Sequence, residues 1–273
     1  MTSNAATPFP VGLTTLHWGE ADAHPRALLL HGLTSAGGTW WQVASALAAG
    51  GWSVTAPDLR GHGGSPRTLR YRLADYAADV LALDPPARST VTASTSTSAA
   101  GRPWDLVVGH SLGGAVATVA AQAHQDWTRA LLLLDPVLSM PDDQHDAVIA
   151  DLLGDLDHLD ADDLLRANPR WHTEDAVQKV TAARVVSPFV VERTVRDNVG
   201  WNLEPVAARI RSHVRVLGAD PQLGASFTAA EGDRLSAASP DSFSFAVVEG
   251  AGHSIHRDDP DRVVAEARAL IAP

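Results

Sequence analysis

Short hydrophobic runs alternate along the chain with longer segments whose apolar residues recur at helical spacing. Several runs are apolar throughout, which is typical of strands covered on both faces of a parallel sheet. Their alternation with helical segments predicts the α/β class, with a mostly parallel, doubly wound sheet flanked by helices. We expect strands within 11–18 and at 26–30, 52–56, 104–108, 130–134, 214–217 and 243–248, and helices at 40–49, 73–83, 112–123 and 261–271.

The pattern changes between residues 137 and 205, where no convincing strand is found. Acidic residues are dense from Asp142 to Asp163, and leucines lie among them at helix-like intervals. We interpret 137–205 as a helical lid inserted into a sheet domain made of 1–136 and 206–273. A segment at 89–100 is nearly all Ser, Thr and Ala, so it is expected to form a flexible surface loop.

One stretch joins a predicted strand to a predicted helix through Gly109-His110-Ser111-Leu112-Gly113. It matches the G-x-S-x-G pattern, in which glycines on both sides of a serine permit a sharp strand-to-helix turn. Such a turn presents the Ser111 hydroxyl at its tip. The N-terminus of the following helix faces the place where an oxyanion would form. Ser111 is therefore the candidate nucleophile.

A serine hydroxyl needs a base, and the base needs an acceptor that orients it. Of the 12 histidines, His253 is best placed, because it follows the last predicted strand between flexible glycines. His256 competes with it, but is expected in the turn before the final helix. Asp220 and Asp135 each follow a strand, at the edge where active sites of such sheets gather. We favour Asp220 as the acid and keep Asp135 in reserve.

Two backbone N–H groups are expected to bind the oxyanion, those of Leu112 and Leu33. Leu33 lies in the loop that His31 and Gly32 shape after a strand, and a structural role suffices for His31. Lid aromatics suggest an apolar substrate pocket. The expected pocket residues are Gly32, His110, Met140, Trp171, Phe189 and Trp201.

Composition limits the partners. The 273 residues are 45% hydrophobic with a net charge of −11 and no basic block, which argues against nucleic-acid and anionic-membrane partners. No cysteine is present, so disulfides, thiolate metal sites and a cysteine nucleophile are excluded. No zinc spacing joins His145, His158 and His172, and no metal is expected. Residues 1–10 lack a signal-peptide pattern, and no stretch approaches the ~20 apolar residues of a membrane span. A cytoplasmic protein is expected, and its oligomeric state is left open.

Four motifs in order resemble the α/β-hydrolase superfamily, in its lidded esterase, lactonase and C–C hydrolase-like branch. The likeness covers nearly the whole chain outside the lid. It implies Ser111 as nucleophile and His253 as base, with the acid most often where Asp220 stands, although the spacing after Gly218 is slightly shorter than usual. It implies structural roles for Asp58 and Arg60. The motifs are His31-Gly32 with Trp40 downstream, Asp58-Leu59-Arg60-Gly61-His62-Gly63-Gly64-Ser65, Gly109 to Gly114, and Gly250-Ala251-Gly252-His253.

These observations predict a serine hydrolase that cleaves a small carboxylic ester or lactone through an acyl-enzyme, with no cofactor. Serine at the elbow argues against the branches that use aspartate there, the haloalkane dehalogenases and epoxide hydrolases. Two other reactions on the same triad stay open, namely C–C bond hydrolysis of a diketone and perhydrolysis of the cofactor-free haloperoxidase kind. A non-catalytic ligand-binding protein is a further alternative, against which the intact Ser, His and Asp set argues.

Overall fold

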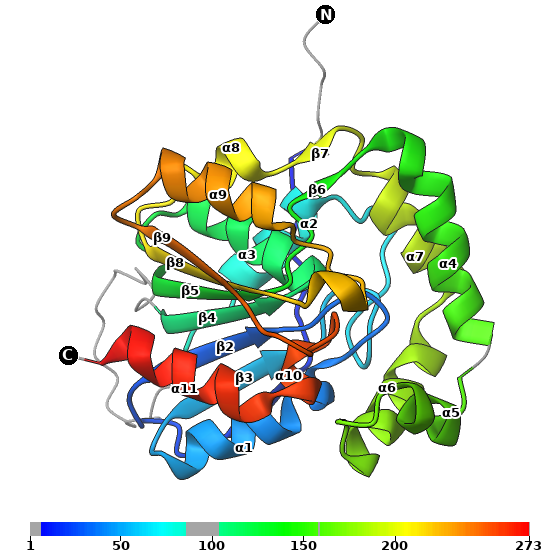
Figure 1. Ribbon diagram of the computed structural model, residues 1–273, viewed down its shortest axis with the longest axis horizontal. Helices are drawn as coiled ribbons and strands as arrows, with labels where there is room; N and C mark the ends of the chain where they lie inside the picture. The colour runs from blue at the N-terminus through cyan, green and yellow to red at the C-terminus, as the bar shows by residue number, and fades with distance from the viewer. Residues whose placement is uncertain (1–6, 86–103, 158, 273) are drawn as a thin grey trace, which may run out of the picture.

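A seven-stranded sheet forms the centre of the computed structural model, which describes residues 7–85, 104–157 and 159–272. The strand order is β1-β3-β2-β4-β5-β8-β9, and β1 alone is antiparallel to its neighbour (Figure 1). This confirms the predicted fold class. The strands are β1 (Thr15–Trp18), β2 (Arg26–Leu30), β3 (Ser53–Pro57), β4 (Trp104–His110), β5 (Thr128–Leu134), β8 (His213–Gly218) and β9 (Phe243–Val247). The segment 89–100 lies outside the described residues.

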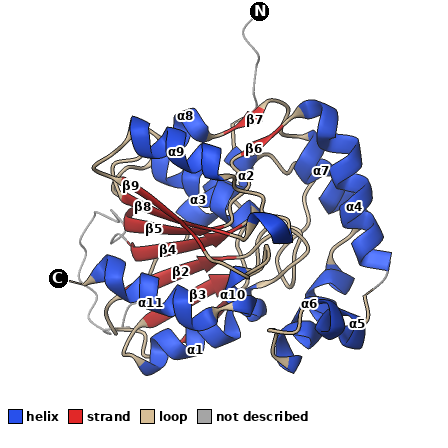
Figure 2. Cartoon of the chain, viewed as in Figure 1, coloured by secondary structure: helices blue, strands red, loops and turns tan. Residues whose placement is uncertain are grey.

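Helices cover both faces of this sheet (Figure 2). On one face lie α2 (Leu73–Leu81), α3 (Leu112–Ala123), α8 (Glu204–Ala207) and α9 (Ala229–Ala238). On the other lie α1 (Trp41–Ala49), α10 (Ile255–Asp258) and α11 (Pro260–Ile271). Strand β2 shows why its run is apolar throughout. Leu28 and Leu30 pack in the first core, and Ala27 and Leu29 pack in the second, so both faces are buried.

Most element bounds differ from the expected ones by a few residues, and 26–30 and 112–123 agree fully. The helix expected at 40–49 begins at Trp41, after a 3-10 turn at Gly37–Trp40. Thr39 does not cap it, because its hydroxyl donates to the carbonyl of Ala36.

The segment 137–205, called the insertion below, lies between β5 and β8 and contains α4 (His145–Asp157), α5 (Ala161–Ala167), α6 (Thr173–Val185) and α7 (Pro188–Arg196). These helices lie beyond the ends of the sheet strands (Figure 1). The expectation of no strand is wrong in one detail, because β6 (Ser139–Met140) pairs with β7 (Trp201–Asn202). Two-residue strands are too short to show a periodic pattern. The proposed domain boundaries stay a prediction.

Contacts with the core anchor the insertion at several points. The Asp175 carboxylate accepts hydrogen bonds from Trp41 Nε1 at 2.9 Å and Gln42 Nε2 at 2.7 Å. In α7, the Thr194 hydroxyl lies 2.8 Å from the hydroxyl of Tyr76 in α2. The insertion is thus held over the carboxyl ends of the strands. Within the described parts of the chain, no helix combines the length and apolar character that crossing a membrane requires.

Candidate active site

The carboxyl ends of three adjacent strands bring the candidate residues together. The sheet register pairs His110 of β4 with Leu134 of β5, and Leu134 with Leu217 of β8. The first residues beyond β4 and β5 extend this ladder, because Ser111 N donates to the Leu134 carbonyl and Asp135 N donates to the Leu217 carbonyl. Ser111 and Asp135 therefore stand side by side at one edge of the sheet.

Ser111 occupies a left-handed backbone conformation, with φ 52° and ψ −116°, between β4 and α3. The flanking glycines make this turn possible through close packing. A Cβ on Gly109 would lie 2.6 Å from the carbonyl oxygen of Gly113, and one on Gly113 would lie 2.2 Å from that of Leu30. Neither backbone neighbour can yield, so both positions require glycine. The elbow thus holds Ser111 in a strained conformation of the kind that clusters at functional sites.

His253 contacts Asp135. Its Nδ1 lies 2.6 Å from Asp135 Oδ2, and the carboxylate is fully buried. Three backbone N–H groups also donate to this carboxylate: those of Ala219 and Phe227 to Oδ1 at 3.2 and 3.1 Å, and that of Ser226 to Oδ2 at 2.8 Å. Both oxygens of this buried carboxylate are thus satisfied by hydrogen-bond donors. The carboxylate therefore fixes the proton of His253 on Nδ1 and leaves Nε2 as the acceptor.

Among the described residues it is Asp135, the reserve acid, whose carboxylate contacts His253 Nδ1, so the geometry favours Asp135 over Asp220 as the orienting acid. Asp220 Oδ2 accepts from Gly250 N and its Oδ1 from Gln222 N, both within the loops that follow β8 and β9. These backbone hydrogen bonds lower the pKa of the Asp220 carboxyl. The loop after β8 instead surrounds Asp135 with its amides. The reserve residue, Asp135, occupies the place expected of Asp220.

The loop that carries Leu33 is organised by buried polar groups. His31 Nε2 accepts from Leu59 N at 2.9 Å, and its Nδ1 donates to the Gly32 carbonyl at 2.8 Å. Burial lowers the pKa of His31 to about 4, so the ring is neutral at pH 7. Its hydrogen bonds join the loop after β2 to the loop after β3. Asp58 accepts from Gly37 N at 2.8 Å and fixes the next part of the same loop. Both residues have the structural roles expected of them.

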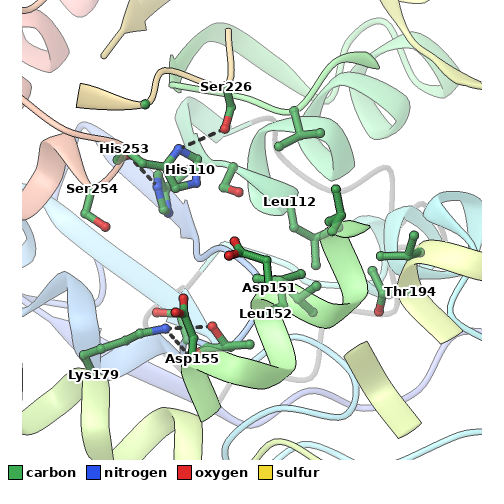
Figure 3. Close-up of a pocket in the computed structure, with 18 of the residues that line it drawn as sticks. His110, Leu112, Asp151, Leu152, Asp155, Lys179, Thr194, Ser226, His253 and Ser254 are labelled. Atoms are coloured by element: carbon green, nitrogen blue, oxygen red, sulfur yellow. Dashed lines mark hydrogen bonds between the residues drawn. The ribbon is translucent and has the colours of Figure 1, made fainter. Parts of the chain in front are cut away.

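A cavity of about 530 Å³ opens onto these residues, and both Ser111 and His253 line it. Figure 3 shows His253 between Ser226 and His110, with Leu112 across the cavity. Of the expected pocket residues, His110, Met140, Trp171 and Trp201 line the cavity. Two others do not. The Phe189 side chain is 46% exposed and packs on Tyr71, and Gly32 is buried against His110 and Ser111.

The cavity lining is mixed, whereas the aromatic residues of the insertion suggest an apolar one. Asp151 and Asp155 of α4 line it, as do Lys179 of α6 and Arg257 of α10. Lys179 donates to Thr34 Oγ1 at 2.7 Å, which joins the insertion to the Leu33 loop. Sequence reasoning did not identify these four residues or Ser226. Lys179 alone gave a signal, as the single lysine of the chain.

Two further histidines pack beneath His253. His110 Nε2 lies 2.9 Å from the His253 carbonyl oxygen, and the ring centroids of His110 and His256 are 4.7 Å apart. Burial lowers the pKa of both His110 and His256 well below the usual value, so neither ring is charged at neutral pH. His256 is thus a buried packing residue and does not compete with His253.

The histidines of the insertion serve other purposes. His145 lies 3.4 Å from Asp142, and the His172 ring accepts from Glu174 N at the start of α6. His158 lies outside the described residues. No cluster of three metal-ligating side chains occurs among the residues that the structure describes.

A family model extends over most of the chain. The model of the alpha/beta hydrolase family matches residues 27–267, from β2 to α11. The chain belongs to the alpha/beta hydrolase family. The match includes the Ser111 elbow, the Asp135 turn and the His253 loop, with the insertion between them.

Several known proteins are similar to the chain to different extents. Lipase LipV of Mycobacterium tuberculosis is 35% identical over 136 residues, which cover 50% of this chain and 46% of the lipase. The alignment thus spans about half of either protein. The crystal structure of E-2-(acetamidomethylene)succinate hydrolase superposes with a TM-score of 0.75 at 20% identity, covering 96% of this chain and 95% of that one. An enol-lactonase from Burkholderia xenovorans gives a TM-score of 0.74 at 19% identity, with 96% of each chain covered. Similarity at this identity shows the shared fold.

Proposed function

We propose that this hydrolase cleaves a carboxylic ester or lactone, with Ser111 as nucleophile, His253 as general base and Asp135 as the orienting acid. The contact of 2.6 Å between His253 Nδ1 and the buried Asp135 carboxylate carries the proposal. It gives a histidine that lines the same cavity as the elbow serine a fixed tautomer, and a fixed tautomer is what activation of a serine hydroxyl requires.

The first half of the reaction acylates the serine. His253 Nε2 takes the hydroxyl proton as Ser111 Oγ forms a bond to the substrate carbonyl carbon. Asp135 stabilises the imidazolium that results. The tetrahedral intermediate then collapses, the carbon–oxygen bond to the alcohol breaks, and His253 returns the proton to the leaving oxygen. The product of this half is an acyl-serine and a free alcohol.

The negative oxygen of the intermediate binds to backbone N–H groups. Leu112 N stands in the first turn of α3, where a helical N–H has no carbonyl four residues before it. Leu33 lines the same cavity from the loop after β2 and supplies the second donor. Each donor of this kind contributes roughly 3–4 kcal/mol to lowering the barrier. In the second half, His253 takes a proton from water as its oxygen bonds to the acyl carbon. The bond from that carbon to Ser111 Oγ then breaks, and His253 returns the proton to Ser111, which releases the acid.

Labelling and turnover together test the proposal. Purified protein is treated with a fluorophosphonate probe and assayed on p-nitrophenyl esters, lactones and a diketone, in parallel with Ser111→Ala. Ser244→Ala is the matched control, because Ser244 lies on β9 outside the cavity lining. We expect covalent labelling and ester or lactone turnover in the wild type and in Ser244→Ala, and neither in Ser111→Ala.

Two results would overturn the proposal. One is folded wild-type protein that neither reacts with the probe nor turns over any ester or lactone, which would favour a ligand-binding role. The other is diketone cleavage that exceeds ester cleavage, which would assign the same residues to C–C bond hydrolysis.

A further inference from the structure

Arg257 is a buried cation that has no ion-pair partner in the part of the chain that the structure describes. It is 3% exposed and lines the cavity that Ser111 and His253 share. Within the described residues, no carboxylate oxygen lies within 4.0 Å of its nitrogens, and its Nε has no hydrogen-bond partner. Buried arginines are normally paired, because an uncompensated buried charge is strongly unfavourable. The absent counter-charge therefore calls for an explanation.

The nearest acidic residues are already bound by other donors. Asp175 accepts from Trp41, Gln42 and the His172 backbone N–H. Asp258 accepts from Trp171 Nε1 at 3.0 Å and from Gly252 N at 2.8 Å. Their charges act on Arg257 from a distance, and burial still lowers the pKa of its guanidinium to about 10. Arg257 thus stays protonated at neutral pH without a directly bound anion.

The polar contacts that Arg257 does make are long. Its Nη1 lies 3.4 Å from Ser254 Oγ, and its Nη2 lies 3.5 Å from Ser35 Oγ. The guanidinium carbon is 4.7 Å from the Trp171 ring centroid, so the indole covers one flat side of the group. An arginine stacked in this manner keeps its N–H edge available for a bidentate acceptor. Two serine hydroxyls flank that edge.

The place of Arg257 relates this edge to the reacting groups. Ser254 follows His253 directly, and Ser35 belongs to the same loop as Leu33, so the guanidinium bridges the loop of the base and the loop of the oxyanion donor. Ser35, Ser254, Trp171 and Arg257 all line the cavity. An anion bound there would be part of a molecule whose carbonyl is at Ser111.

Among the described residues, the cavity contains three charged side chains besides Arg257, namely Lys179, Asp151 and Asp155. The Lys179 ammonium donates to Thr34 Oγ1, and its charge interacts with those of Arg257 and Asp155 (Figure 3). Asp151 lines the cavity on the α4 side. Two cations and two carboxylates therefore line the same cavity, and their charges do not by themselves distinguish a monoanion from a dianion. Titration with inorganic phosphate makes that distinction.

We propose that Arg257, with Ser35 and Ser254, binds a carboxylate of the substrate, so that the preferred ester or lactone is one derived from a short dicarboxylic acid. This inference rests on the proposed function for the reaction at Ser111, and adds the substrate class. The guanidinium edge receives the carboxylate in a bidentate contact, and the two hydroxyls donate to the same oxygens. The buried cation then has its counter-ion only when substrate is bound.

Matched substrates test the proposal without reference to any variant. The monoethyl esters of succinate, glutarate and adipate each have a neutral counterpart in which a carboxamide replaces the free carboxylate. We expect kcat/KM, measured by ethanol release, to be roughly tenfold or more higher for at least one acid than for its carboxamide, as a charge-assisted bidentate contact implies. Equal kcat/KM values for all three pairs would overturn the proposal.

Variants separate recognition of the carboxylate from a purely structural role. Arg257→Gln should bring the ratio of kcat/KM for the acid to kcat/KM for the carboxamide close to one, mainly through a higher KM for the acid. Arg257→Lys should retain part of the preference for the acid. Arg215→Gln is the control, because Arg215 pairs with Glu266 away from the cavity, and it should leave the ratio unchanged. If Arg257 only supports the fold, Arg257→Gln would lower kcat/KM equally for the acid and the carboxamide and leave their ratio unchanged. If Arg257→Gln does not fold, the wild-type ratio and Arg257→Lys decide.

A binding measurement distinguishes failure of this inference from failure of the proposed function. The same ligand pairs are titrated calorimetrically into Ser111→Ala, which lacks the nucleophile, and inorganic phosphate is titrated separately. Tighter binding of the acid without any wild-type turnover would uphold the carboxylate site and refute the serine hydrolase reaction. Turnover of neutral esters with equal Kd values for acid and carboxamide would do the reverse. Tighter binding of phosphate than of every monoester would refute the choice of a carboxylate.

Discussion

Replacement of Asp135 by Asn tests the assignment of the acid most directly. The carboxylate is fully buried and has four donors around two oxygens, namely three backbone N–H groups and His253 Nδ1. Asn keeps the shape but presents one oxygen and one NH2 group. If the NH2 group faces His253, the ring must accept at Nδ1 and carry its proton on Nε2. That tautomer cannot take the proton of Ser111.

The magnitude follows from this geometry. Loss of the correct tautomer should lower kcat by about 10⁴-fold, the effect of the same change in a serine protease triad, which equals about 5.5 kcal/mol of barrier. If the side-chain amide of Asp135→Asn flips instead, its NH2 group faces the buried N–H groups of Ala219 and Phe227. The free energy of unfolding should then fall by about 1–3 kcal/mol. Activity on a p-nitrophenyl ester and urea unfolding followed by circular dichroism measure the two effects.

Asp220→Asn is the matched control. Asp220 accepts from Gly250 N and Gln222 N at the surface, so the change should leave kcat within about threefold and the free energy of unfolding within about 1 kcal/mol. The reasoning is refuted if Asp135→Asn, correctly folded, retains activity within tenfold of the wild type while Asp220→Asn abolishes it.

Three further predictions concern the fold that supports the site. Burial lowers the pKa of His31 to about 4 and of His62 to about 3. As the pH falls, these two rings are therefore protonated in the unfolded chain before they are protonated in the folded chain. Stability should be full above pH 6.5 and fall toward pH 4, by about 2 kcal/mol for each ring at pH 5, in urea titrations at several pH values. Asp79→Asn leaves Arg60 buried without its counter-ion and should lower the free energy of unfolding by about 3–5 kcal/mol. Gly113→Ala places a methyl group 2.2 Å from the Leu30 carbonyl oxygen and should destabilise by more than about 3 kcal/mol, or prevent folding, as thermal unfolding will show.

The pH dependence has an outcome that would contradict it, and the two substitutions each have a matched control. Unfolding stability that rises between pH 6.5 and 5 would contradict the histidine argument. Glu204→Gln removes a partly exposed pairing with Arg234 and should change stability by less than about 1 kcal/mol, against the larger loss in Asp79→Asn. Gly154→Ala lies in α4, where an added Cβ meets nothing within 4 Å, so it should not destabilise. Equal losses in either matched pair would refute the corresponding argument.

The sheet and the elbow were predictable because they depend on local patterns. A run buried on both faces, such as β2, is apolar at every position, and the elbow needs glycine at fixed offsets from Ser111. The acid was not predictable in the same way. Whether Asp135 or Asp220 meets His253 depends on how the loop after β8 turns its amides toward β5, and both residues follow a strand equally well in sequence.

Residues whose burial depends on distant segments were also missed. Arg257 stands in a polar turn, and its burial results from Trp171 and from the loop that holds Ser35, both far away in sequence. The opposite error concerns Phe189, whose aromatic ring suggests a buried pocket residue. Phe189 is instead half-exposed, and its ring packs against Tyr71. Hydrophobicity alone does not tell these two cases apart.

The pairing of β6 with β7 means that the insertion could be exchanged for another segment. Met140 lies opposite Trp201, and Ser139 opposite Asn202, so the chain leaves the sheet domain and returns to it at a single point. A tight hairpin joining the two strands would close the backbone there without displacing β5 or β8. Helical segments of other lengths and sequences could be grafted onto the same stem. The helices of the insertion can therefore be replaced, by evolution or by design, while Ser111, His253 and Asp135 keep their positions.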